Sequence, residues 1–243
     1  TSDLNILTIT GSSITGGSVT SYVNGPMVRR FPASLVAGST YVFPLGKSGS
    51  YNPLALVDPL TTSGGTVDIK TEVFAANAGG TAGTGLSAIN TDRYWQSSIS
   101  SGAGNFTSAK IRLTDAAVQG GRRVGLSATV NGSYSSIGGL ISGTDITSDV
   151  TTTLGYFLVG KTNITFSGSV NVGTGETYTT LTGVGGLFSV INSALVTGNL
   201  TVNITSNLTE DGTNALNQWA NDGGTWNLTI QPADASIKTI SGT

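Results

Sequence analysis

The stretch TYVFPLGKSGSYNPLALV, residues 40–57, decides the fold class. Two apolar segments flank a cluster of Gly, Ser, Asn and Pro, the residues that favour turns. Similar short apolar segments with a period of two recur along the chain, and Thr, which suits a pleated surface, is abundant between them. Short strands at turn-punctuated intervals predict an antiparallel β-sandwich.

The pattern changes near Lys161. Apolar residues at 187, 188, 191, 195 and 196 have helical spacing, and residues 216–219 are a candidate second helix. Leu200, Val202 and Ile204 then alternate with polar residues. This order is compatible with the first coils of a parallel β-helix and equally with a small α+β module. We therefore predict an all-β chain: a strand and flexible joint at 1–20, a β-sandwich at 21–161, and a smaller β-rich module with one or two short helices at 162–243.

Composition excludes several classes of function. Charged residues make up only 10% and the net charge is −2, without the basic stripe that nucleic-acid binding needs. No apolar run reaches the roughly 20 residues of a membrane-spanning helix. With 0 His and no Cys, neither an imidazole base nor a thiolate nucleophile is present. The chain begins at Thr1 rather than Met, which we interpret as a processed product or a fragment.

Several short segments of the sequence resemble segments of large secreted surface proteins of Bacteroidetes-type bacteria. They lie at residues 22–27, 43–47, 51–54, 93–95 and 155–157, and 178–242 resembles the segment that leads into β-helical repeats in such proteins. The resemblance covers most of the chain. It is a similarity of short sequence motifs and includes no catalytic signature. It implies a cell-surface, adhesin-like or filament-forming role and no catalytic residues.

The carboxylates are few. Glu210 and Asp211, with Asp222 on a neighbouring loop, are a candidate glycosidase pair, because such enzymes need two converging carboxyl groups. We favour the alternative, solvated turn carboxylates. Asp145 and Asp149 are candidate Ca²⁺ ligands, although no ordered calcium-loop signature surrounds them. We therefore predict no enzyme, no catalytic residue, and no cofactor or metal site beyond this weak calcium candidate.

Aromatic side chains offer flat apolar faces on which sugars stack. Trp95, Trp219 and Trp226, together with Tyr51, Tyr94 and Tyr178, are candidate glycan contacts. For Trp95 and Trp226 we favour a core position, because each lies in a strand pattern. Asn-x-Ser/Thr sequons occur at Asn105, Asn131, Asn163, Asn199, Asn203, Asn207 and Asn227, as expected by chance in so Thr- and Asn-rich a chain.

The segment with Leu4, Ile6, Leu7 and Ile9 is joined to the next block by the Gly/Ser-rich residues 11–17. A strand on such a joint can insert into the sheet of a neighbouring subunit; pairing within its own domain is the alternative that we favour. From the sequence we predict an extracellular structural or adhesive cell-surface protein that forms homo-oligomers or polymers, and a filament or lattice if the strands exchange. A carbohydrate-binding module that contacts surface glycans is the first alternative, and a β-helical polysaccharide-degrading enzyme the second.

Overall fold

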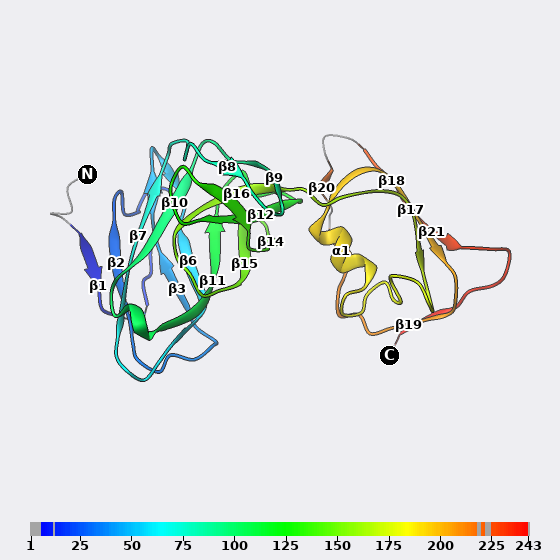
Figure 1. The fold of residues 1–243 in the computed structure, drawn as a ribbon, viewed down its shortest axis with the longest axis horizontal. Helices are drawn as coiled ribbons and strands as arrows, with labels where there is room; N and C mark the ends of the chain where they lie inside the picture. The colour runs from blue at the N-terminus through cyan, green and yellow to red at the C-terminus, as the bar shows by residue number, and fades with distance from the viewer. Residues whose placement is uncertain (1–5, 12, 218–219, 222–224, 243) are drawn as a thin grey trace. The chain divides into compact units, whose positions relative to one another are not determined.

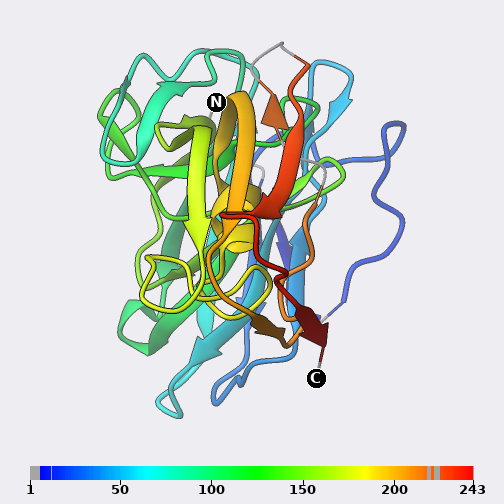
Figure 2. The same ribbon diagram turned by 90° about the vertical axis from the view of Figure 1, so that its right-hand side faces the viewer.

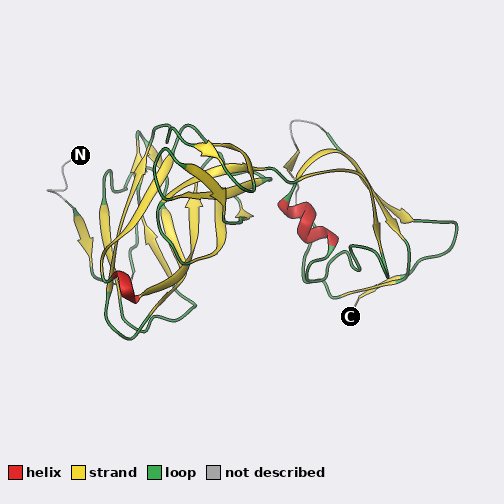
Figure 3. Ribbon diagram, in the orientation of Figure 1, coloured by secondary structure: helices red, strands yellow, loops and turns green. Residues whose placement is uncertain are grey.

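The computed structural model describes residues 6–11, 13–217, 220–221 and 225–242. The chain is mostly β-structure and divides into two compact units, residues 1–161 and 162–243. Figure 1 follows the chain through both units, and Figure 3 marks the helix α1 (Leu187–Ser193) and the 3₁₀ turn at Ala103–Asn105 in red. The all-β class predicted from the sequence is therefore confirmed.

Unit 1 contains two large sheets. As far as the described residues extend, the first sheet has the order β1-β2-β7-β10-β16-β12-β13-β8, with β9 also paired to β16. Its strands are β1 (Leu7–Ile9), β2 (Met27–Phe31), β7 (Val67–Phe74), β8 (Thr81–Ala82), β9 (Leu86–Ile89), β10 (Tyr94–Ser101), β12 (Arg122–Ser127), β13 (Ser133–Ser136) and β16 (Tyr156–Thr162).

The second sheet has the order β14-β15-β11-β6-β3, and its neighbouring strands are antiparallel. Its strands are β3 (Thr40–Phe43), β6 (Leu54–Thr61), β11 (Phe106–Thr114), β14 (Leu140–Ser142) and β15 (Asp145–Thr151). The stretch at 40–57 supplies β3, the small hairpin of β4 (Gly46–Lys47) and β5 (Ser50–Tyr51), and the start of β6.

One core lies between the two sheets. Alternate residues of each strand point inward, such as Val67, Ile69 and Val73 on β7. They pack against Leu54 and Ile111 of the opposite sheet and against other buried side chains of the same cluster. This arrangement is a β-sandwich, as the alternating patterns predict.

Unit 2 is built from parallel strands. The strands β17 (Thr165–Val172), β18 (Leu195–Ile204) and β21 (Leu228–Pro232) lie side by side in register, as Figure 2 shows, and β20 (Ala220–Asn221) also pairs with β18. A second parallel pair joins β19 (Leu208–Glu210) to β22 (Ile240–Gly242). Equivalent positions recur after roughly 30 residues, the geometry of successive β-helix coils. The sequence is compatible with a parallel β-helix or a small α+β module, and unit 2 has the geometry of the β-helix.

Like residues stack on the outer face of these coils. Asn171, Asn203 and Gln231 occupy one position in successive strands. The Asn203 amide donates to Asn171 at 3.4 Å, and the Gln231 amide donates to Asn203 at 3.1 Å. We call these three residues the amide ladder. In the next row, Val170 and Val202 pack in the core of unit 2, and Ile230 continues the row at 41% exposure, so the ladder holds the register that aligns this apolar row.

The residues expected to form a second helix are not helical where the structure describes them. Leu216 and Asn217 lie in an irregular segment, and the Asn217 N–H donates to the Asn192 side chain at 2.8 Å instead of to a carbonyl one turn earlier. Residues 218 and 219 lie outside the described residues. Among the described residues, no helix is long and apolar enough to cross a membrane.

Candidate functional site

Of the predicted N-terminal strand, the structure describes β1 at Leu7–Ile9, which pairs in parallel with β2 of its own sheet. This strand forms an edge of the first sheet. Ile6 is partly buried, Leu7 is 47% exposed, and Ile9 packs partly against the core. Leu4 lies outside the described residues.

Arg29 on β2 fixes the chain that follows β1. Its guanidinium is buried, and it donates to the Gly11 carbonyl at 3.2 Å and to the Val42 carbonyl of the opposite sheet at 2.8 Å. The guanidinium also lies 4.8 Å from the Tyr41 ring centroid, a cation–π distance. Burial lowers the pKa of Arg29, yet an arginine stays charged in proteins. Arg29 therefore links three segments around the edge strand.

Trp95 in unit 1 offers no ring face on which a sugar could stack. Trp95 is completely buried in the sandwich core, and its indole Nε1 donates to the Asn52 carbonyl at 2.9 Å. Its candidacy as a glycan contact is wrong, because neither ring face reaches solvent. Trp226 is partly buried against the core of unit 2, and Trp219 lies outside the described residues.

The candidate carboxylates have other roles. Glu210 is buried, and its oxygens accept hydrogen bonds from the N–H groups of Leu181 at 2.8 Å and Thr182 at 2.7 Å and from the Thr182 hydroxyl at 2.6 Å. It is therefore not a solvated turn carboxylate. Asp211 is exposed, and the hydrogen bond from the Thr213 N–H lowers the pKa of Asp211. Asp222 lies outside the described residues.

The calcium candidates are not brought into a ligand cluster. Asp145 accepts from the Thr114 hydroxyl at 2.5 Å and lies 3.8 Å from the Arg112 guanidinium. Asp149 lies beside Gly138. Within the described part of the chain, no group of three or more Asp, Glu, His or Cys side chains is placed to hold a metal.

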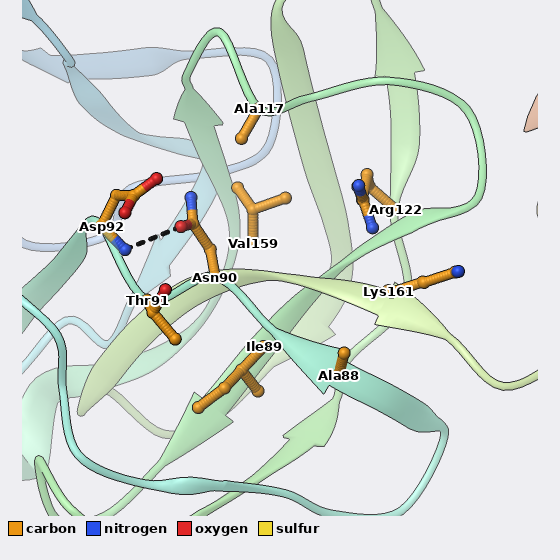
Figure 4. A pocket seen from close by; sticks show the side chains of 9 residues that line it. All are labelled: Ala88, Ile89, Asn90, Thr91, Asp92, Ala117, Arg122, Val159 and Lys161. Carbon is orange, nitrogen blue, oxygen red and sulfur yellow. Dashed lines mark hydrogen bonds between the residues drawn. The ribbon is translucent and has the colours of Figure 1, made fainter. Parts of the chain in front are cut away.

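A concavity of unit 1 lies where β9, β12 and β16 meet (Figure 4). Its volume is about 360 Å³, within the range of small-molecule sites. Arg122 and Lys161, which are directly opposed residues of the antiparallel strands β12 and β16, line one side. Like charges at opposed positions are destabilising. Sequence reasoning missed this pair, because their proximity depends on strand register rather than spacing.

The other side of this concavity is polar and built on an Asx turn. Asn90 and Asp92 flank Thr91, and the Asp92 N–H donates to the Asn90 side-chain oxygen at 2.8 Å. The Asn90 N–H in turn donates to the Val159 carbonyl at 2.9 Å, which ties the turn to β16. The Asn90 amide NH₂ therefore remains as a donor. We call this concavity the β9–β16 pocket.

Ile89 and Val159 also line the pocket, but Val159 is only 2% exposed and packs in the sandwich core, whereas Ile89 packs against a separate cluster. The rim near Ala117 is held by Asp115, whose carboxylate accepts from the Ala117 N–H at 2.6 Å and from the Arg93 guanidinium at 2.5 Å. Asp115 is buried, so this rim is fixed by a charge-assisted pair inside the fold. The pocket is therefore lined mainly by two cations and by the polar turn.

Comparison with known proteins adds no relative: no protein-family model, no curated protein and no solved structure matches this chain.

Proposed function

We propose that this protein is an extracellular structural or adhesive component of a bacterial cell surface, and that its copies associate by strand addition at the β1–β2 edge. The proposal is supported by the all-β fold, by a surface poor in charge, and by the resemblance of the sequence to secreted surface proteins. The observation that carries it is the difference in side-chain exposure between β1 and its neighbour β2.

β2 is much more deeply buried than β1. Met27, Val28 and Arg29 are 0%, 7% and 1% exposed, whereas Leu7 is 47% exposed. These residues are directly paired, since Leu7, Thr8 and Ile9 oppose Met27, Val28 and Arg29. If β1 left this position, β2 would expose its backbone groups and part of the core, which favours rebinding of a strand with the same side chains.

The connection to the rest of the chain is suited to exchange. Between Ile9 and Met27 the described residues form no strand; Ser18 bridges Ser21 and Val23 bridges Leu45, so the joint for an exchange lies before Ser18. Gly16 has a φ of 87°, a conformation that glycine adopts at little cost. A β1 strand that is exchanged makes the same contacts with β2 of another copy as it makes within its own chain. Whether copies associate therefore depends chiefly on protein concentration and on the connection between β1 and β2.

The absence of Cys from the chain allows a direct test. In the double variant Thr8→Cys, Val28→Cys, the two thiols occupy opposed positions of β1 and β2. We expect oxidation of concentrated protein to give a covalent series of dimers and higher oligomers on a non-reducing gel. As a control, Lys70→Cys with Ser98→Cys joins β7 to β10 inside the sheet and should give only internal cross-links.

If the Thr8→Cys, Val28→Cys variant yields only internally cross-linked monomer at every concentration, strand addition is wrong. Deletion of residues 1–10 gives an independent check: oligomers measured by light scattering should disappear, and their persistence unchanged would also contradict the proposal.

A further inference from the structure

We propose that a second copy of this chain docks end to end on unit 2, so that the free edge of β21 in one copy pairs in parallel with the free edge of β17 in the other. These two strands are the outer strands of their sheet (Figure 2). The inference concerns unit 2 alone and does not depend on strand addition at the β1–β2 edge. It rests on three features of the coil ends: unpaired backbone groups, an amide ladder with a direction, and exposed apolar residues.

The outer edge of β21 presents unpaired backbone groups. The Leu200 N–H of β18 donates to the Asn227 carbonyl, just before β21, at 2.9 Å. Successive residues of a parallel strand direct their backbone groups to alternate sides, so Ile230, three residues later, directs its N–H and C=O away from β18. No strand in the described part of the chain pairs with this edge.

β17 presents the opposite edge with the complementary pattern. The Gly173 N–H, just after β17, donates to the Tyr178 carbonyl at 2.9 Å on the side away from β18. By the same alternation, Ser169 and Asn171 direct their backbone groups to this side. In the register that the coils already use, the Ile230 N–H of one copy faces the Ser169 carbonyl of the other, and the Asn171 N–H faces the Ile230 carbonyl.

The amide ladder has a direction that selects unlike ends. Each later coil donates its NH₂ group to the oxygen of the earlier coil, Asn203 to Asn171 and Gln231 to Asn203. The Asn171 NH₂ at β17 and the Gln231 oxygen at β21 therefore have no hydrogen-bond partner among the described residues. Placed in one row, this donor and this acceptor continue the ladder, whereas two like ends would bring together two donors or two acceptors.

The last coil also exposes apolar side chains whose equivalents one coil earlier are covered. Ile230 is 41% exposed, whereas Val202 beside it is fully buried. Likewise Ile240 is 49% exposed, whereas Leu208, its partner in the second parallel pair, is 4% exposed. At the other end, a concavity of about 570 Å³ lies along β17 and is lined in part by Val170, which occupies the row of Ile230. Docking therefore covers apolar surface on both copies.

The paired length is short. Pro232 has no N–H to donate, and the Gly173 N–H already has its acceptor in Tyr178, so the new ladder has few bonds. The association is therefore weak in free solution and contributes little to light scattering. Covalent capture is the suitable measurement.

The test is disulfide capture between two variants of the full chain. Ser169 and Thr229 are exposed and occupy one row of the coils beside the ladder, so Ser169→Cys and Thr229→Cys leave the ladder intact. The chain has no Cys of its own. In an equal mixture oxidised slowly, chance would make the heterodimer as abundant as the two homodimers together. We expect the heterodimer to exceed them at least about tenfold, because only this pair meets at a bridging distance. Mass spectrometry with one variant isotope-labelled counts the three species.

Two variants probe the junction. Ile230→Lys, added to Thr229→Cys, should reduce the heterodimer about tenfold or more, because a charge on a free edge opposes pairing. Asn171→Asp, added to Ser169→Cys, keeps an oxygen to accept from Asn203 and removes the donor that faces the second copy, so it should also reduce capture. Hydrogen exchange of unit 2 shows whether each variant is folded, and Asn171→Asp serves alone if Ile230→Lys is not.

Val36→Lys is the matched control, since it places the same charge on an apolar residue of unit 1 that is 73% exposed, and it should leave capture unchanged. Ala215→Cys, exposed in unit 2 but outside these strands, should form heterodimer with Ser169→Cys only as chance predicts. Deletion of residues 1–10 should leave capture unchanged, which separates this proposal from strand addition.

The proposal is overturned if the heterodimer of Ser169→Cys and Thr229→Cys is no more abundant than chance predicts. It is also overturned if Val36→Lys lowers capture as much as Ile230→Lys does, because the effect would then come from overall charge. An excess of Ser169→Cys homodimer would mean that like ends associate, against the direction of the ladder.

Discussion

Glu210→Gln is expected to destabilise unit 2 by about 3 kcal/mol. The carboxylate accepts three hydrogen bonds, two from the backbone N–H groups of Leu181 and Thr182 and one from the Thr182 hydroxyl. With the Gln oxygen in the place of Oε2, both bonds from Thr182 are kept, but the NH₂ group faces the Leu181 N–H and leaves that buried donor without an acceptor. A hydrogen bond to a charged group contributes roughly 1.5–3 kcal/mol, and the two remaining bonds lose their charge assistance, which together give the figure above.

This loss is a large part of what holds unit 2 together. For roughly 80 residues, total stability is expected at about 4–12 kcal/mol. Hydrogen exchange followed by mass spectrometry reads unit 2 separately from the sandwich. For amides that exchange by unfolding of unit 2, a loss of about 3 kcal/mol accelerates exchange roughly 150-fold. Peptides that contain Leu181 and β18 should show the effect, and peptides from β7 and β10 should not.

Glu176→Gln is the control for this experiment, since Glu176 is a partly exposed carboxylate of the same unit. It should change exchange by less than about threefold, as expected for a surface substitution. If Glu210→Gln and Glu176→Gln accelerate exchange equally, the hydrogen bonds of the Glu210 carboxylate do not stabilise unit 2.

Three further predictions concern the sandwich. Trp95→Phe should lower its stability by about 2–4 kcal/mol in urea unfolding, because it leaves a cavity and a buried carbonyl without its donor; a shift below about 1 kcal/mol would contradict this. Gly102→Ala should lower stability by more than about 2 kcal/mol, since Gly102 has a φ of 73° and the added Cβ would meet a backbone carbonyl. Gly104→Ala, with open space around it, should be near neutral. Equal melting temperatures of the two variants would refute the steric argument. Burial raises the pKa of Tyr134 to about 12. The stability that the neutral Tyr134 hydroxyl contributes to the fold is therefore fully present below about pH 10, the pKa of Tyr in the unfolded chain, and is lost as the pH rises through 12. The fall in stability at alkaline pH should be smaller in Tyr134→Phe.

Local patterns predicted the strands of this protein well. Alternation at Leu200, Val202 and Ile204 marked a strand that is buried on its apolar side. The strand pattern also favoured a core position for Trp95, and the structure places it there. These successes share one reason: inward and outward positions of a strand depend on neighbours two residues away.

Features that depend on distant residues could not be predicted in the same way. The sequence predicts a turn carboxylate at Glu210, because its actual partners lie 28 and 29 residues away, one coil earlier. The parallel pairing of unit 2 was undecided for the same reason, since period alone does not show which strand lies beside which. The β9–β16 pocket needs residues from three separated segments, around Asn90, Arg122 and Lys161.

The amide ladder has a consequence for how such a chain can change. Each coil presents to its successor the same rows of side chains that it receives from its predecessor, such as Asn171 to Asn203 and Asn203 to Gln231. Duplication of a whole coil would therefore create no new kind of interface. Insertion of one residue within a strand would instead turn its apolar side chains toward solvent. Genetic variation in length should thus be tolerated in steps of a coil, or in the connecting loops, and rejected inside the strands.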